Sequence, residues 1–155
     1  MSKSLKRVRA ALDALGVDTP IHEVEKAKTA AEAAASLGCK VDQIANSIIF
    51  MGQASGEVRL FLTSGANRVD PERAAMVAGE PLGKADAAII RAQTGFAIGG
   101  VAPVGHTSPT PAFYDPHLMT FDIIYAAAGT PRHLFALPPV QMMEIASAQA
   151  ADFTA

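Results

Sequence analysis

Apolar and polar positions along the chain follow two periods, one typical of helices and one typical of strands. Near the N-terminus the apolar positions recur at helical spacing. The run begins after Ser4, which we expect to cap a helix, and stops before Gly16, which we expect to end it. One face of this helix should therefore pack against a core. Its apolar positions are Leu5, Val8, Leu12 and Leu15.

Further helices are predicted by the residues at their ends. Thr29 and Glu32 form a capping box, in which the hydroxyl and the carboxylate each satisfy a free backbone N–H at the helix start. Asp70 followed by Pro71 is a cap with proline at the first helical position. We expect helices over about 30–37, 71–79, 85–94 and 139–148, a single helical turn over 41–45, and a turn or a short helical segment over 115–119.

Short runs of alternating or continuous apolar residues indicate strands. Turn residues 53–56 join two of these runs into a hairpin, and 129–131 join the last two as antiparallel partners. Because strands pair locally while helices arrive in clusters between them, the pattern favours an α+β fold with a mixed sheet. We find no repeat, linker or boundary, so we expect residues 1–155 to form a single domain. Strands are expected over 20–24, 47–51, 58–63, 96–98, 121–127 and 133–137.

Composition places the chain among globular intracellular proteins. Half of its 155 residues are apolar and 18% are charged, so a core can form without disulfides or metals. Cys39 is the only cysteine, which excludes an internal disulfide and favours a cytoplasmic location. The longest apolar runs, such as Tyr125–Ala128, fall far short of the ~20 residues that span a bilayer. We therefore expect no membrane partner.

The distribution of charge limits the nucleic acids that the chain can bind. A net charge of −2 argues against a broad polyanion-binding surface and a long duplex footprint, so we expect no DNA partner. A small nucleic-acid end can still be gripped locally. One basic cluster lies on the first predicted helix, where a solvated helix face explains it as well. Its members are Lys3, Lys6, Arg7 and Arg9.

The segment from Thr94 to His106 is the most unusual stretch of the sequence. Three glycines and a proline fall within the seven residues from 99 to 105, which indicates backbone that bends tightly and stays exposed. Such a loop can offer N–H donors to a carbonyl oxygen or an oxyanion, although a tight structural turn explains the same residues. It is not a Walker loop, because no Gly-Lys-Ser/Thr follows, and it lacks the spacing of a dinucleotide fingerprint.

Other candidate residues are scattered along the chain. His106 directly follows the loop and can bind or polarise a substrate, or serve as a structural or solvated histidine. The remaining histidines share no metal-ligand spacing, so we expect neither a metal nor another cofactor. Ser64 lies at a strand end, where either a pocket mouth or a polar turn is expected, and no Gly-x-Ser-x-Gly elbow occurs. Cys39 is not at a helix N-terminus that would activate its thiol, so we expect it to be inert.

Taken in order, several motifs resemble those of the YbaK / prolyl-tRNA synthetase-associated domain family. The most specific is the Gly-Gly-Val-x-Pro-x-Gly stretch that begins at Gly99, and the resemblance covers nearly the whole chain. It implies a mixed, largely antiparallel, barrel-like sheet flanked by helices. The other motifs are Thr29–Gly38, Val41–Phe50, Ser64–Asp70 and Ala127–Gly129.

The resemblance also implies an activity and a partner. Members of this family hydrolyse, in trans, the ester that joins a wrong amino acid to the 3′ end of a tRNA, typically the tRNA for proline. Prolyl-tRNA synthetase is a second candidate partner. The backbone donors of the glycine/proline loop position the ester carbonyl, while substrate hydroxyls or water supply much of the remaining chemistry.

Site residues follow from the same resemblance. Gly99, Gly100 and Val101 are implied to line the reacting centre as the catalytic segment. Pro103 would rigidify the loop, and Gly105 and His106 would flank the pocket. The substrate-binding residues would be Asn46, Ser64, Pro103, Gly105, His106 and Gly129.

One position departs from the family pattern. The family's characteristic lysine falls where this chain has Asn46, which can form hydrogen bonds but cannot neutralise a phosphate. A nearby Lys40 or Arg68 would be an alternative cation. The sequence therefore leaves three hypotheses: an aminoacyl-tRNA deacylase, a non-catalytic binder of aminoacyl-tRNA or a small aminoacyl or nucleotide ligand, and a hydrolase of another small ester or amide.

The oligomeric state is likewise open. An exposed apolar face on the last predicted helix would indicate a dimer, whereas a core-facing stripe explains the same residues in a monomer. These residues are Met142, Met143 and Ile145.

Overall fold

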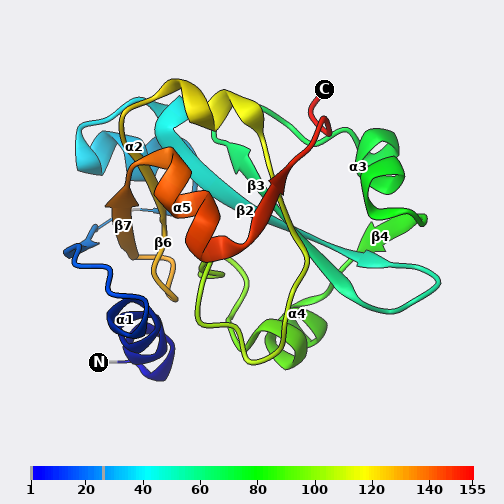
Figure 1. Cartoon of the computed structure of the whole chain (residues 1–155), viewed down its shortest axis with the longest axis horizontal. Coiled ribbons are helices and arrows are strands. Elements are labelled where there is room, and N and C mark those ends of the chain that lie inside the picture. The colour runs from blue at the N-terminus through cyan, green and yellow to red at the C-terminus, as the bar shows by residue number, and fades with distance from the viewer. Residues whose placement is uncertain (1, 26) are drawn as a thin grey trace.

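Helices and strands alternate unevenly along the chain in this computed structural model, which describes residues 2–25 and 27–155 (Figure 1). The helical elements of this part are α1 (Lys3–Ala14), α2 (Ala30–Leu37), α3 (Pro71–Ala78), α4 (Ala87–Thr94) and α5 (Pro139–Ala146), with 3₁₀ turns η1 (Val41–Gln43) and η2 (Pro116–Thr120). The strands are β1 (Ile21–Glu23), β2 (Ile44–Gly52), β3 (Val58–Ser64), β4 (Leu82–Lys84), β5 (Ala112–Tyr114), β6 (Ile124–Ala127), β7 (His133–Leu137) and β8 (Ala148–Ala150).

Polar side chains set the starts of the helices. Thr29 caps α2 as predicted, because its hydroxyl accepts the N–H of Glu32 at 3.1 Å. Ser2, and not Ser4, caps α1: its hydroxyl accepts the N–H of Leu5 at 3.0 Å, so Ser4 is already helical. Asp86 caps α4, which therefore begins two residues later than expected.

The strands form one mixed sheet in the order β1-β7-β6-β2-β3-β5-β8, with β4 paired to β2, throughout the described residues. The hairpin of β2 and β3 is its longest ladder, and β6 pairs antiparallel with β7, both as predicted. Parallel pairs join β2 to β6, β3 to β5 and β5 to β8, which makes the sheet mixed. In Figure 1, α1 and α2 lie at one end of this sheet and α3 with β4 at the other.

The apolar pattern missed some strands and produced one wrong strand. β4, β5 and β8 have only three residues each, too few for a period of two to be visible. The strand expected over 96–98 is a turn, although Phe96 is fully buried. Its N–H donates to the hydroxyl of Thr94 at 3.1 Å, and the N–H of Gly100 donates to Ala97 O at 3.0 Å. A local acceptor therefore takes the Phe96 N–H that a strand would offer to a neighbour.

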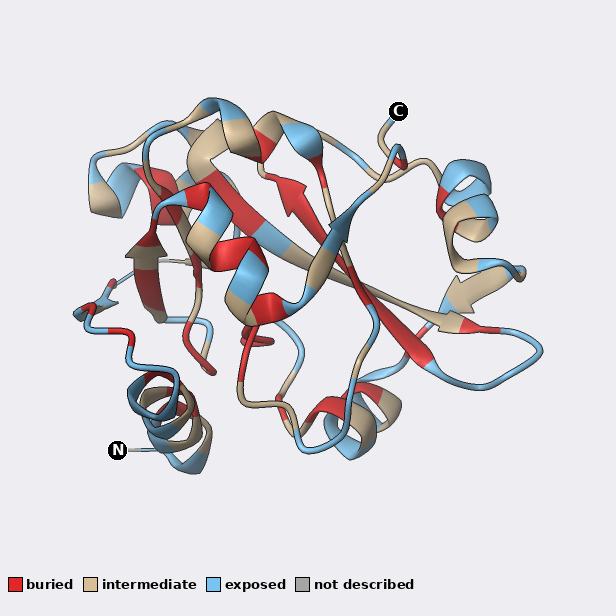
Figure 2. Cartoon of the chain, in the orientation of Figure 1, coloured by how far each residue is buried: buried red, intermediate tan, exposed pale blue. Residues whose placement is uncertain are grey.

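The main core lies where the sheet curls against α1, α4, α5 and the glycine/proline loop. Side chains from β7 and partly buried Ala148 of β8 reach the same cluster, although these strands lie at opposite parts of the strand path. Figure 2 shows buried residues along β3 and on the inner side of α5. Met142 and Met143 belong to this core, so the apolar stripe of α5 faces inward and gives no support for a dimer. Within the described part of the chain, no helix is long and apolar enough to cross a bilayer.

Candidate functional site

A pocket of about 270 Å³, which we call the Asn46 pocket, opens between β2, the segment before α2, the glycine/proline loop and the turn between β6 and β7. Four segments that are far apart in sequence therefore meet around it. Its polar side chains are those of Lys28, Thr29, Asn46 and Ser47. Its other lining residues are Ala27, Ala30, Ala33, Ile44, Ala45, Gly99, Ala127, Pro131 and Leu134.

The alternation of β2 decides which way Asn46 faces. Successive side chains of a strand point to opposite faces, so Asn46 shares a face with Ile44. Ile44 packs in a small core with Ala33 and Ala34 of α2, whereas Ala45 belongs to the main core on the other side of the sheet. Asn46 therefore faces the side that α2 covers, and it is exposed there.

Ser47 joins β2 to the loop. Its hydroxyl donates a hydrogen bond of 2.7 Å to the backbone oxygen of Val101. Val101 is buried in the main core and does not itself line the Asn46 pocket. Ser47 thus fixes the loop against the strand that carries Asn46.

Close backbone contacts set the shape of the loop beside the pocket. A Cβ atom on buried Gly100 would lie 2.8 Å from Thr130 Cα and 3.0 Å from Gly129 O. Gly129, with φ +98°, in turn approaches α1: a Cβ there would lie 2.7 Å from Ser4 O. Any side chain at either position would push these backbones apart. Gly99 is different, because it is exposed and its own Cβ would meet only Pro131 at 3.6 Å.

The N–H groups of the loop are not equally available to a ligand. That of Gly100 already donates to Ala97 O. Those of Gly99 and Val101 donate to no acceptor among the described residues. Of these two residues only Gly99 is exposed and lines the Asn46 pocket, so a carbonyl oxygen in the pocket would find its backbone donor there.

His106 stabilises the far end of the loop. Its Nε2 lies 2.6 Å from Ala102 O and its Nδ1 lies 3.0 Å from the Thr110 hydroxyl, so both ring nitrogens have partners. The ring packs edge-on against Phe96, with centroids 5.3 Å apart. Burial lowers the pKa of His106 below its usual 6.5, which favours the neutral imidazole.

Several predicted site residues lie away from the Asn46 pocket. Pro103, Gly105 and His106 line a separate groove of about 440 Å³ between α1, the loop and the end of α5. Ser64 is fully buried, and its hydroxyl donates a hydrogen bond of 2.8 Å to Asp42 O. This arrangement corresponds to the polar turn that the sequence offered as one alternative, and not to a pocket mouth. The predicted site thus divides: Asn46 and Gly99 line the pocket, with Gly100 and Gly129 packed behind it.

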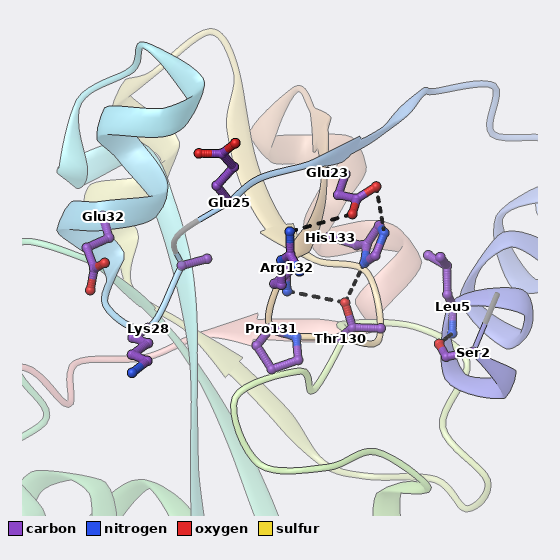
Figure 3. A pocket seen from close by; sticks show the side chains of 11 residues that line it. Ser2, Leu5, Glu23, Glu25, Lys28, Glu32, Thr130, Pro131, Arg132 and His133 are labelled. Carbon is purple, nitrogen blue, oxygen red and sulfur yellow. Dashed lines mark hydrogen bonds and ion pairs between the residues drawn. The ribbon is translucent and has the colours of Figure 1, made fainter.

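A larger pocket of about 1090 Å³, which we call the Glu23 pocket, adjoins the first (Figure 3). Ala27, Lys28 and Pro131 line both pockets, so the two lie side by side. Figure 3 shows the polar cluster in its wall. His133 Nδ1 lies 2.6 Å from the Thr130 hydroxyl, and its Nε2 lies 3.9 Å from a carboxylate oxygen of Glu23.

The histidines and the cysteine provide no metal centre. Among residues 2–25 and 27–155, no three His, Cys, Asp or Glu side chains are grouped so that they could hold a metal ion. His117 lies 2.8 Å from Asp42, and this hydrogen bond lowers the pKa of the Asp42 carboxyl. Burial raises the pKa of the Cys39 thiol, which disfavours the reactive thiolate.

Sequence reasoning missed the residues that complete the pocket. Lys28 and Pro131 have no motif of their own, because they enter from segments that only the fold brings together. Ser47 follows Asn46 in the sequence, where the family has its characteristic lysine. This neighbourhood was the one feature of the sequence that could have indicated Ser47 as a pocket residue. Neither of the alternative cations, Lys40 and Arg68, lines the pocket.

The fold, the glycine-rich loop and the pocket beside it define the class of protein. Residues 24–145 match the family model of the aminoacyl-tRNA editing domain, and the chain belongs to that family. The predicted resemblance and fold class are thereby confirmed.

Two solved structures and one curated protein are similar to this chain over most of its length. A crystal structure provisionally described as a trans-editing enzyme for prolyl tRNA synthetase is 41% identical, with a TM-score of 0.92, and the match covers 100% of this chain and 99% of that one. The hypothetical protein APE2540 is 27% identical, with a TM-score of 0.85 over 96% of this chain and 99% of that one. The uncharacterized protein YwhH of Bacillus subtilis (strain 168) is 27% identical over 91% of this chain and 90% of its own length.

Proposed function

We propose that this chain is a trans-editing deacylase, which hydrolyses the ester between a small wrong amino acid and the 3′ end of the tRNA for proline. The observation that carries the proposal is the Asn46 pocket, where the loop at Gly99 meets a small cavity with both apolar and polar walls. Membership of the aminoacyl-tRNA editing domain family supports the reaction, and the 41% identical relative supports a link to prolyl-tRNA synthetase. A tRNA substrate and the single cysteine fit a cytoplasmic location.

The proposed reaction is a simple ester hydrolysis. Water adds to the carbonyl carbon, the bond from that carbon to the ribose oxygen breaks, and the ribose oxygen takes up a proton. The products are a free amino acid and an uncharged tRNA. The N–H group of Gly99 is the proposed backbone donor to the oxyanion, and Gly100 contributes by allowing close packing against Thr130.

The proton must be moved by groups other than a protein triad. No histidine, cysteine or carboxylate stands among the described residues that line the Asn46 pocket. A ribose hydroxyl next to the ester, or a second water, therefore takes the role of base in our proposal. Asn46 would hold such a hydroxyl or the carbonyl through its side-chain amide.

A non-catalytic binder of aminoacyl-tRNA or of a small aminoacyl or nucleotide ligand is the second candidate. It is favoured by Asn46, whose neutral amide cannot stabilise negative charge as a lysine would. The same pocket would then recognise the aminoacyl end without hydrolysing it.

Deacylation of mischarged proline tRNAs separates the two candidates. Wild type and Asn46→Lys would be assayed on tRNAs carrying alanine, cysteine, serine and threonine. Turnover by wild type establishes a deacylase. No turnover by wild type, with turnover gained in Asn46→Lys, identifies a binder.

Two further variants test whether deacylation takes place in the Asn46 pocket. Asn46→Ala removes an exposed amide that the fold does not need, and we expect a loss of about 10-fold or more in kcat/KM. Gln149→Ala removes an exposed amide on β8 and should leave kcat/KM unchanged. Equal losses in both variants would contradict a role for the Asn46 pocket. Hydrolysis of a simple amino-acid ester as fast as that of the tRNA would instead favour a general small-ester hydrolase.

A further inference from the structure

Lys28 carries the only formal charge among the described residues that line the Asn46 pocket. It precedes the cap of α2, is exposed, and forms no ion pair within 4.0 Å in the described part of the chain. It also lines the Glu23 pocket, in whose wall Figure 3 shows it, so Lys28 is shared by the two pockets.

The surroundings of Lys28 differ on its two sides. The carboxylates of Glu25 and Glu32 line the Glu23 pocket and not the Asn46 pocket. Apart from Lys28, the described residues that line the Asn46 pocket are therefore neutral. An anionic group of a ligand seated in the Asn46 pocket would be attracted to this side, because no described carboxylate there competes for the ammonium.

We propose that Lys28 binds the phosphodiester that precedes the 3′-terminal nucleotide of the substrate. The inference rests on the proposed function, and it deepens it by naming the residue that recognises the nucleic acid. An ester held at Gly99 leaves one ribose between the reacting carbon and that phosphate. The flexible four-carbon stem of a lysine suits such a contact, because an ammonium binds phosphate as a point charge without a fixed angle.

Lys28 is a binding residue in this proposal and takes no part in the bond changes. Its loss should weaken the affinity for ligands that carry the phosphate and spare ligands that lack it. The contact is at the surface and single-stranded, so its removal should also lower the salt dependence of binding, by about 0.7 in the slope of log K against log salt.

Two stable ligands test the proposal by their dissociation constants. One is a CCA trinucleotide with alanine joined to its 3′ end by an amide, and the other is the matching 3′-alanylamido adenosine without phosphate. For Lys28→Ala we expect about 5- to 10-fold weaker binding of the trinucleotide and a change below about 2-fold for the nucleoside. Lys28→Arg should restore most of the loss. Lys84→Ala removes an exposed charge from β4, far from the pocket, and should change neither constant.

The two dissociation constants distinguish a failure of the Lys28 contact from a failure of the proposed function. If Lys28→Ala weakens both ligands equally, or if Lys84→Ala weakens the trinucleotide as much, the phosphate contact is refuted. If wild type binds both ligands and Lys28→Ala binds them unchanged, the assignment of Lys28 fails while the proposed function stands. If wild type binds neither ligand, the proposed function itself fails and the assignment of Lys28 with it.

Discussion

The guanidinium carbon of Arg7 lies 4.5 Å from the centre of the Phe96 ring, so α1 is fastened to the segment that leads into the glycine/proline loop. The same side chain donates from Nε to Gly105 O at 2.7 Å and from Nη2 to Gly95 O. One arginine therefore joins the two ends of the loop. It lies outside the residues that match the editing family, which begin at residue 24.

Replacing Arg7 by lysine tests this fastening. Arg7→Lys keeps the charge but loses the planar fork that reaches two backbone oxygens and stacks on Phe96. We expect the free energy of unfolding in urea to fall by about 1–2 kcal/mol. Lys6→Ala, on the exposed side of the same helix, should change it by less than about 0.5 kcal/mol. Equal stability of Arg7→Lys and wild type would show that α1 does not hold the loop.

Gly100→Ala tests the close approach of the loop to the turn at Thr130. The added Cβ would lie 2.8 Å from a backbone atom, so one of the two segments must shift. We expect a loss of about 1–3 kcal/mol in stability and at least ~10-fold in kcat/KM for deacylation. Gly56→Ala provides the control, since its φ of +74° is strained but nothing lies within 4 Å. That variant should lose about 1 kcal/mol and keep its kcat/KM. An unchanged kcat/KM in Gly100→Ala would show that deacylation does not depend on the close packing of the loop at this position.

Local signals predicted most of the fold. The caps Thr29 and Asp70, the hairpin turn and the apolar runs of β3 and β7 all act over a few residues, and the structure confirms them. The predicted cap of α1 at Ser4 was wrong, because the hydroxyl of Ser2 accepts the N–H of Leu5 and Ser4 is already helical. The parallel pairs of β5 also gave no signal, since their partners lie far away in the chain.

The site was less predictable than the fold. The glycine pattern indicated the loop, and the family pattern drew attention to Asn46, which does line the pocket beside Gly99. His106 seemed chemically suitable from its position after the loop, yet both its nitrogens are used internally. Lys28 has an ordinary sequence context and gains its place only because β2 and the turn after β6 are brought beside it.

Two serines with similar hydrogen bonds provide a matched test of the pocket's location. Ser64 donates to Asp42 O at 2.8 Å and lies away from the pocket, whereas Ser47 donates to Val101 O at 2.7 Å and lines it. Both Ser64→Ala and Ser47→Ala should lose about 1 kcal/mol of stability. We expect kcat/KM to fall in Ser47→Ala alone, because only that bond fixes the loop. If folded Ser64→Ala lost as much kcat/KM as Ser47→Ala, the functional site would have to lie near Ser64 instead.

Stability should depend on pH through His106. Its pKa is lowered in the folded chain, chiefly by burial, so the unfolded chain binds this proton more readily. As the pH falls below about 6.5, the unfolded state gains the proton first and the free energy of unfolding decreases. The slope can reach about 1.4 kcal/mol per pH unit for one proton. The decrease ends near the lowered pKa, below which both states are protonated.

His106→Gln isolates this contribution. Urea titrations of wild type and variant between pH 7.5 and 5 should show a steeper loss for wild type, and other titrating groups cancel in the difference. The pKa values of Asp42 and Glu80 are also lowered, by hydrogen bonds from His117 and from the Ser55 backbone, so these carboxyls weaken the fold only below their usual 3.8 and 4.5. Equal slopes in wild type and variant would mean that His106 stays accessible to protons in the folded chain. A steeper wild-type slope would mean that a neutral imidazole at His106 holds the far end of the loop, through its contacts with Ala102 O and the Thr110 hydroxyl.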